Sequence, residues 1–297
     1  MTGVLGEVLT AIVTPFDKDG AVDYDRFRAL ARHVIDSGAD GLVVAATTGE
    51  SPTLTDDEKL ELWGAAVDEV GARATVIAST GTYSTAHSVH LTEQAHELGV
   101  HGFLVVTPYY NKPPPRGIVE HYKAIAEASD RPIVVYNIPQ RVVVNIEPDT
   151  LIELAQIPSV QAVKQATEDL DQARRIVAET DLALYAGSDH LLQPFLELGG
   201  AGGILVYAHL VAARVKEQVR LYRDGDVDGA RAIDQELKPV IDALAVTINP
   251  IPVKAALSMF GHDVGGLRLP LVEASEEERA EIRSGLERAG LTVQAGV

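Results

Sequence analysis

Short apolar runs rich in β-branched residues alternate along this chain with segments of helical periodicity. Eight of the runs are predicted to be strands, and each is followed by a segment with the apolar spacing of an amphipathic helix. Most are continuously apolar, as expected for parallel strands covered on both faces. The predicted strands are Leu9–Val13, Gly41–Ala46, Thr75–Ser79, Gly102–Val106, Ile133–Tyr136, Val160–Lys164, Leu182–Ala186 and Gly203–Val206. Eight successive strand–helix units predict a (β/α)8 TIM barrel.

Local start and stop signals support the intervening helices. Thr55 and Glu58 have the spacing of a capping box, and Gly38 and Gly99 follow apolar faces as stop signals. We expect barrel helices over residues 27–35, 55–67, 84–98, 117–128, 148–156, 170–179 and 190–198. The alternative is an open, doubly wound sheet. Its dinucleotide-binding version has little support, because no G-x-G-x-x-G follows the first predicted strand.

The chain changes character after the eighth predicted strand. From about His209 onward only helical patterns follow, over residues 211–223, 227–246, 252–260 and 276–289. The first of these is the expected eighth barrel helix, and Ser275 and Glu278 form a second capping box before the last. We predict a catalytic barrel over residues 1–224 and an all-helical C-terminal domain over residues 225–297.

Composition narrows the possible partners. The 297 residues include 43 acidic and 25 basic side chains, a formal net charge of −18, which argues against nucleic acid and anionic membranes. A small anionic substrate stays possible, because a few local arginines can outweigh a distant acidic surface. There is no cysteine, so disulfides and thiolate nucleophiles are excluded. The N-terminal residues do not resemble a signal peptide, and no apolar run could span a bilayer. We expect a cytoplasmic protein.

Lys164 is the residue that most strongly suggests chemistry. It ends the predicted buried strand V-Q-A-V-K, and a buried amine that is free of its proton is a nucleophile suited to forming a Schiff base with a carbonyl substrate. The alternative is a lysine that extends to water or pairs with a carboxylate. The other lysines fall in predicted loops or helices, which favours the functional reading; they are Lys18, Lys59, Lys112, Lys123, Lys216, Lys238 and Lys254.

Other polar residues follow the C-terminal ends of the predicted strands, where barrels carry their chemistry. Tyr136 could transfer protons during imine formation, and Arg141 could bind a carboxylate through two hydrogen bonds. Thr47 and Thr48 could bind a carboxylate or relay a proton, and Gly49 would let backbone N–H groups approach an anion.

Each of these residues also has a plain structural explanation. Thr47 and Thr48 could cap a turn, and Arg141 could be a solvated surface charge. Tyr109 and Tyr110 could be packing aromatics beside a proline-rich loop. We expect Glu50 to order its loop rather than to titrate in catalysis.

No metal site is predicted from the sequence. Asp189 and His190 could suggest one, but no third ligand accompanies them. The histidines of the third predicted helix and its flank lack metal-ligand spacing; they are His87, His90, His96 and His101.

Several motifs together resemble the dihydrodipicolinate synthase family, which uses a Schiff base to pyruvate. They are T-T-G-E-S at 47–51, T-P-Y-Y-N-K-P at 107–113, Y-N-I-P-x-R at 136–141 and V-K-Q-A-T at 163–167. The segments N-P-I-P-V-K-A-A-L at 249–257 and L-R-L-P-L at 267–271 are similar to the family too. Each motif is weak alone, but their order and spacing over nearly the whole chain are highly specific.

The resemblance implies a lyase of lysine and diaminopimelate biosynthesis that needs no metal or organic cofactor. Lys164 would form an imine with pyruvate, and Tyr136, Thr47 and Tyr110 would form a proton relay. Tyr110 would come from the neighbouring subunit of a homotetramer, a dimer of dimers. Thr48 would hold the carboxylate of pyruvate. The remaining implied contacts are Arg141 with the carboxylate of L-aspartate 4-semialdehyde, and the backbone of Gly187 and Ile204 along the site. The product would be 4-hydroxy-tetrahydrodipicolinate.

Two other functions are weighed against this one. An N-acetylneuraminate lyase-like or other 2-keto-acid aldolase usually has Ser-Thr-Gly-Glu in place of Thr47-Thr48 and lacks an equivalent of Arg141. A catalytically silent keto-acid sensor would not need Lys164. Departures from the family pattern lie beside the site and bear on the choice of substrate: Val142-Val143 for Thr-Gly, Ser188 for Asp, Leu205 for Ser and His209 for Asn.

The resemblance also bears on regulation. Lysine-inhibited members carry an Asn and a Glu at the start of the third helix, and a His after the T-T-G-E motif. Here these positions align with Tyr83, His87 and Asp56. Because the carboxylate that would hold the ammonium of lysine is replaced, we predict weak or absent feedback inhibition.

Overall fold

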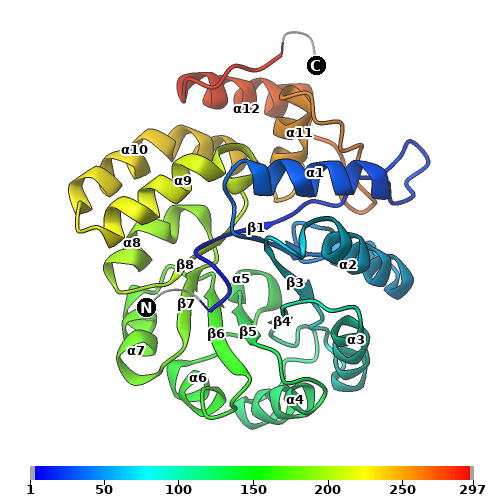
Figure 1. Ribbon diagram of the computed structural model, residues 1–297, viewed down its shortest axis with the longest axis vertical. Helices are drawn as coiled ribbons and strands as arrows, with labels where there is room; N and C mark the ends of the chain where they lie inside the picture. Colours follow the sequence, from blue (N-terminus) through cyan, green and yellow to red (C-terminus); the bar gives the residue numbers. More distant parts are fainter. Residues whose placement is uncertain (1–3, 295–297) are drawn as a thin grey trace.

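Eight parallel strands close into a barrel in sequence order, with helices around them (Figure 1). The computed structural model describes residues 4–294. The strands are β1 (Val8–Ala11), β2 (Gly41–Val44), β3 (Thr75–Ser79), β4 (Gly102–Val106), β5 (Ile133–Asn137), β6 (Val160–Gln165), β7 (Ala183–Ala186) and β8 (Gly202–Leu205). Pairing of β1 with β8, Leu9 opposite Ile204, closes the sheet. The predicted TIM barrel is therefore confirmed, and the open sheet is excluded.

The helices alternate with the strands as the sequence predicts, with small shifts at their ends. They are α1 (Tyr24–Asp36), α2 (Asp56–Val70), α3 (Thr85–Glu97), α4 (Pro115–Glu127), α5 (Pro139–Val142), α6 (Pro148–Leu154), α7 (Leu170–Glu179), α8 (Leu192–Glu197), α9 (Ala208–Arg223), α10 (Val227–Leu244), α11 (Ile251–Met259) and α12 (Glu276–Arg288). Two 3-10 helices, η1 (Ser51–Thr53) and η2 (Asp189–Leu191), follow β2 and β7. Both predicted capping boxes form.

Three local differences have physical reasons. The second strand ends at Val44, two residues earlier than predicted, because Ala45 has the left-handed φ of 54° and leaves the sheet. The short helix α5 was not predicted; it begins at Pro139, whose fixed φ suits a first helical turn, and ends at Val142, before Val143 with its left-handed φ of 67°. The helix predicted from His190 begins at Leu192, because the 3-10 turn η2 precedes it.

The barrel interior and the helical layer form two apolar clusters. The interior cluster includes Leu9, Val43, Leu104 and Val134, and it also contains Tyr136. In the parallel register Tyr136 lies opposite Lys164. Because side chains in register share a face, Lys164 points into the barrel with Tyr136.

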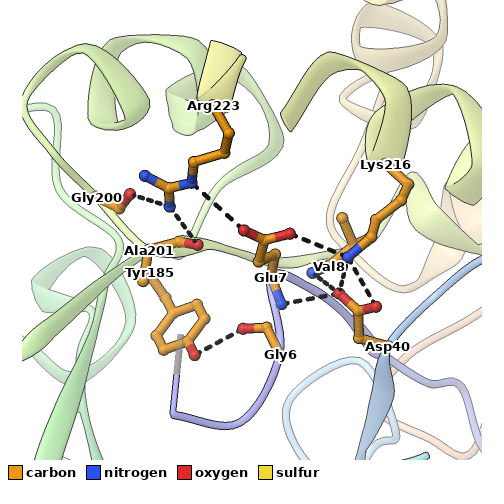
Figure 2. A network of polar contacts seen from close by, with 9 residues as sticks. All are labelled: Gly6, Glu7, Val8, Asp40, Tyr185, Gly200, Ala201, Lys216 and Arg223. Atoms are coloured by element: carbon orange, nitrogen blue, oxygen red, sulfur yellow. Dashed lines mark hydrogen bonds and ion pairs between the residues drawn. The ribbon is translucent and has the colours of Figure 1, made fainter. Parts of the chain in front are cut away.

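Charged residues close the N-terminal end of the barrel, where the chain enters β1, β2 and β8 (Figure 2). Lys216 Nζ lies 2.7 Å from Asp40 Oδ2 and 3.1 Å from Glu7 Oε2. The same Asp40 oxygen accepts hydrogen bonds from the backbone N–H groups of Glu7 and Val8, at 2.8 and 2.9 Å. Arg223 contacts Glu7 Oε1 at 3.4 Å and donates to the carbonyls before β8. This network joins the strands on both sides of the closure.

The C-terminal helices form a layer that continues from the barrel. α10 packs on α9, and α12 packs on α10 and α11, toward the top of Figure 1. The predicted boundary at residue 224 falls in the short connection between α9 and α10. That residues 225–297 form a separate domain stays a prediction.

Candidate active site

Lys164 is buried inside the barrel near its C-terminal end. Its exposed fraction is 4%, and its Nζ lies 4.2 Å from the centroid of the Tyr136 ring. Within residues 4–294, no carboxylate lies at ion-pair distance from Lys164 Nζ. Lys164 thus neither extends to bulk water nor pairs with an acid of the described chain, so both plain explanations of a strand lysine fail. Burying an amine without an acidic partner costs free energy, so this placement favours a functional role for Lys164.

A cavity of about 320 Å³ opens beside Lys164. Its lining brings together predicted site residues from the ends of four strands: Thr47, Thr48, Tyr136, Arg141, Lys164 and Gly187. A second hollow of about 210 Å³ shares Thr47, Tyr136 and Arg141 and is also bordered by Tyr109. Residues separated by up to 140 positions in the sequence therefore meet at one place, as the barrel topology requires.

Three predicted site residues lie elsewhere in this chain. Tyr110 is 92% exposed and borders neither hollow. Ile204 is buried in the barrel interior. A Cβ at Gly49 would come within 3.1 Å of Ala45 Cα and 3.2 Å of the Ile12 carbonyl oxygen. Gly49 is thus needed for close packing of its loop, and its predicted contact with an anion stays a prediction.

The segment before α11 reaches the site, which the residue pattern did not predict. Asn249 Nδ2 donates a 2.9 Å hydrogen bond to Thr48 Oγ1, and the Asn249 carbonyl accepts a 3.0 Å hydrogen bond from Arg141. Residues 244–245 and 247–249 also line the cavity. The signal that could have found Asn249 is the N-P-I-P-V-K motif, which resembles the family but contains no residue that suggests chemistry by itself.

Asp189 is the only carboxylate among the described residues that line the cavity. Its two oxygens accept hydrogen bonds from the N–H groups of Val206 and Tyr207, at 2.8 and 3.0 Å. Burial raises the pKa of Asp189 to about 6, and these N–H groups and the charge of Lys164 oppose the shift. Asp189 therefore holds the turn after β8. No group of three His, Cys, Asp or Glu side chains suited to a metal ion occurs in residues 4–294.

His209 joins the ends of β1 and β8. Its Nδ1 lies 2.7 Å from the Val206 carbonyl oxygen, and its Nε2 accepts a 3.1 Å hydrogen bond from the Val13 N–H. These contacts assign the neutral tautomer with a proton on Nδ1. Burial lowers the pKa of His209 to about 4. A histidine can thus occupy the place of the family's asparagine because it supplies one donor and one acceptor.

Two of the residues aligned with the regulatory positions contact each other. His87 Nε2 lies 2.7 Å from Asp56 Oδ2, and Lys59 Nζ lies 3.5 Å from Asp56 Oδ1. Tyr83 is 56% exposed and packs edge-on against Tyr109, with ring centroids 5.3 Å apart. The Asp56 carboxylate is therefore already engaged by two basic groups.

The site can perform carbonyl chemistry. The amine of Lys164 lies beside a phenol, with threonine hydroxyls and a guanidinium around the same cavity. These are the groups needed to form an imine, move its protons and bind carboxylates.

Comparison with known proteins decides the family. The model of the dihydrodipicolinate synthetase family matches residues 4–289. The chain belongs to this family. It is 49% identical over 288 residues to the 4-hydroxy-tetrahydrodipicolinate synthase of Moorella thermoacetica, covering 96% of this chain and 99% of that protein.

Solved structures of the dihydrodipicolinate synthetase family share the fold throughout. The DHDPS of Cyanidioschyzon merolae with lysine bound is 40% identical, with a TM-score of 0.96 over 98% of this chain and 100% of that one. The chloride-inhibited enzyme of Acinetobacter baumannii, complexed with pyruvate, is 36% identical, with a TM-score of 0.93 over 96% of this chain and 99% of that one. The predicted resemblance is confirmed. No helix in residues 4–294 is long and apolar enough to cross a membrane.

Proposed function

We propose that this lyase condenses pyruvate with L-aspartate 4-semialdehyde through an imine on Lys164 and gives 4-hydroxy-tetrahydrodipicolinate. The activity is that of the family to which the chain belongs. The observation that supports Lys164 as the nucleophile is its buried Nζ beside Tyr136 and the cavity, with no carboxylate partner in residues 4–294. The Acinetobacter baumannii relative in complex with pyruvate supports the first substrate.

The first half-reaction joins Lys164 to pyruvate. The neutral Nζ attacks the keto carbon, and loss of water leaves a protonated imine. Tyr136, with its ring next to Nζ, delivers and removes protons, and Thr47 at the same cavity extends the relay. Thr48 holds the pyruvate carboxylate, with its hydroxyl oriented by Asn249. Removal of a methyl proton then gives an enamine.

The second half-reaction forms the carbon–carbon bond. The enamine carbon attacks the aldehyde, whose oxygen takes up a proton. Arg141 binds the carboxylate of the semialdehyde, and its hydrogen bond to the Asn249 carbonyl fixes its direction. The substrate's own amine then attacks the imine carbon, closes the ring and releases Lys164 as an amine.

The proposed function also includes assembly into a homotetramer. Tyr110 extends away from its own subunit, which suits a contribution to the relay of a neighbouring one in a homotetramer. A cytoplasmic location belongs to the same proposal.

The test is trapping with borohydride in the presence of pyruvate, followed by peptide mass mapping. The expected result is a reduced pyruvyl adduct on Lys164 and on no other lysine. The absence of any adduct would overturn the Schiff-base mechanism. Condensation assays with aspartate semialdehyde and with N-acetylmannosamine then separate the proposed reaction from that of a sugar-acid aldolase.

A further inference from the structure

A second buried lysine lies five residues after Asn249, which lines the cavity of the candidate site, and this lysine plays no part in the proposed chemistry. Lys254, in α11, has a side chain only 2% exposed, and its Nζ lies 2.6 Å from Oε1 of Glu50, which is 1% exposed. Lys254 also donates to the Gly266 carbonyl at 2.7 Å and lies 4.2 Å from the centroid of the Phe16 ring. The other Glu50 oxygen accepts the Arg268 N–H at 3.0 Å.

Stability alone is a poor explanation for this pair. Removing two charges from water costs free energy, and a well-packed apolar pair of similar volume is often as stable or more so. Buried ion pairs are best explained where they select one conformation among several. Here the ion pair would select the conformation of the loop between β2 and η1, which contains Thr47 and Thr48.

That loop is held in an unfavourable backbone shape. Ala45 and Glu50, at its two ends, have left-handed φ values of 54° and 58°. Residues without a glycine's freedom adopt such values only where their surroundings enforce them. The Glu50 carboxylate is the buried side-chain anchor at the far end, two residues after Thr48.

Helix α11 and the segment just before it contact both parts of the loop. Asn249, just before α11, donates to Thr48 Oγ1 at 2.9 Å, and Lys254, within α11, holds Glu50 at 2.6 Å. The Asn249 carbonyl also accepts a 3.0 Å hydrogen bond from the Arg141 guanidinium. The position of α11 is therefore coupled to the hydroxyl of Thr48 and to the guanidinium of Arg141.

We propose that Glu50 and Lys254 are positioning residues that fix Thr47 and Thr48 for pyruvate, so that helix α11 of the C-terminal extension is part of the active site. Neither residue touches substrate. This inference rests on the proposed function, because it assumes that Thr48 binds the pyruvate carboxylate. Loss of the pair lets the loop relax from its left-handed turns and turns the Thr48 hydroxyl away from the cavity.

The experiment compares Glu50→Gln, Lys254→Met and the double variant, using initial rates against pyruvate concentration and thermal melting. Each single variant leaves one buried charge unpaired, so both lose stability, and their KM for pyruvate rises by about tenfold with a smaller change in kcat. The double variant removes both charges. It regains most of the melting temperature but keeps the raised KM. A double variant with parental stability and parental KM overturns the proposal.

Two controls keep the outcome decisive. Lys216→Met breaks a comparable cluster at the opposite end of the barrel and is expected to lower the melting temperature without changing KM for pyruvate. Lys254→Arg retains the charge, and its KM is expected to fall between those of the parent and Lys254→Met. If the arginine variant is as stable as the parent yet matches the methionine variant in KM, the pair does not position the loop. Borohydride trapping of the parent, done first, tests the proposed function independently.

Discussion

The two ends of the barrel hold charged groups in opposite ways. At the N-terminal end, Lys216 lies within 3.1 Å of both Asp40 and Glu7 (Figure 2). At the C-terminal end, Lys164 has no carboxylate partner in the described chain and instead lies over the ring of Tyr136. Burial opposes the change, but hydrogen bonds to Asp40 and Glu7 raise the pKa of Lys216, so this amine keeps its proton. The Lys164 amine is not engaged by an acid and borders the cavity of the candidate site.

The difference separates stability from reactivity. The N-terminal network satisfies its charges and ties together strands that are distant in sequence, which is typical of the stabilising face of a TIM barrel. The C-terminal end leaves the Lys164 amine without an acidic partner, which costs stability and suits the nucleophilic role proposed for it. Substitutions at the two ends should therefore give opposite results in assays of activity and of unfolding.

The largest effect is expected for Lys164→Ala. Without the amine no imine forms, and kcat should fall by about a thousandfold or more. The free energy of unfolding should stay the same or rise, because a costly buried amine is removed. Steady-state kinetics and urea unfolding measure the two quantities. Lys238→Ala, at an exposed ion pair on α10, is the matched control and should change neither. If Lys164→Ala retains a tenth of the activity, the C-terminal end of the barrel does not owe its reactivity to this amine.

Arg141→Ala should reduce kcat/KM for the semialdehyde by about a hundredfold, because a charge-assisted carboxylate contact is lost. Adduct formation with pyruvate should change by no more than about threefold, since Arg141 acts on the second substrate. Rates of borohydride trapping and of condensation, measured on the same preparation, distinguish the two steps. Arg174→Ala, on the exposed side of α7, is the control. An equal loss in both steps would mean that Arg141 shapes the whole cavity.

Acid should destabilise the fold through His209. Its pKa of about 4 lies below the ordinary value near 6.5, so the unfolded chain takes up a proton first as the pH falls. The stability that this neutral histidine contributes is present above pH 6.5 and is lost as the pH falls toward 4, by about 2 kcal/mol between pH 7 and 5. His121, with a pKa also lowered to about 4 by burial, acts in the same direction.

Asp189 has the opposite effect on the pH dependence of stability. Its raised pKa of about 6 means that the folded protein binds a proton before the unfolded chain does, so stability is gained as the pH falls below 6. Urea unfolding of the parent and of His209→Asn at pH 7 and pH 5 separates these contributions. The variant should lose about 2 kcal/mol less than the parent over this interval. If the free energy of unfolding of the two proteins falls equally between pH 7 and pH 5, His209 is not a source of the acid destabilisation.

Asp40→Asn should destabilise the protein by about 1–2 kcal/mol, because Lys216 loses its nearest partner while the amide still accepts from the backbone N–H groups. The figure is modest since Asp40 and Lys216 are partly exposed and screened by solvent. Both kcat and KM should match those of the parent. A change in KM for pyruvate would show that the two ends are coupled and would weaken the contrast.

The smallest effect is expected for added lysine. At the positions aligned with the lysine-binding residues, the Asp56 carboxylate already has partners, because His87 Nε2 lies 2.7 Å from Asp56 Oδ2 and Lys59 Nζ lies 3.5 Å from Asp56 Oδ1. Millimolar lysine should therefore leave the initial rate unchanged. The combined substitutions Tyr83→Asn, His87→Glu and Asp56→His, which restore the residues of lysine-inhibited members, should introduce inhibition. Strong inhibition of the parent by lysine would contradict the prediction.

The sequence by itself predicted the barrel, which the structure confirms, and it singled out Lys164 as the candidate nucleophile. Strand and helix periodicities are local properties, so eight apolar runs separated by capped helices predict the fold. The same local patterns predict that Lys164 lies in one of those strands. Barrel topology places the C-terminal end of every strand at one rim, so the positions of Thr47, Tyr136 and Arg141 along the chain are enough to predict that they meet.

Only the tertiary structure decided which charges are paired. Lys254 reads as an ordinary helical lysine, yet it is as buried as Lys164 and is neutralised by Glu50, about 200 positions away. Asn249 likewise contacts Thr48, which lies 201 positions earlier in the chain. No local pattern encodes such contacts, because they depend on how α11 packs on the loops above the strands. A lysine's chemistry depends on its partner, and the partner is selected by the fold.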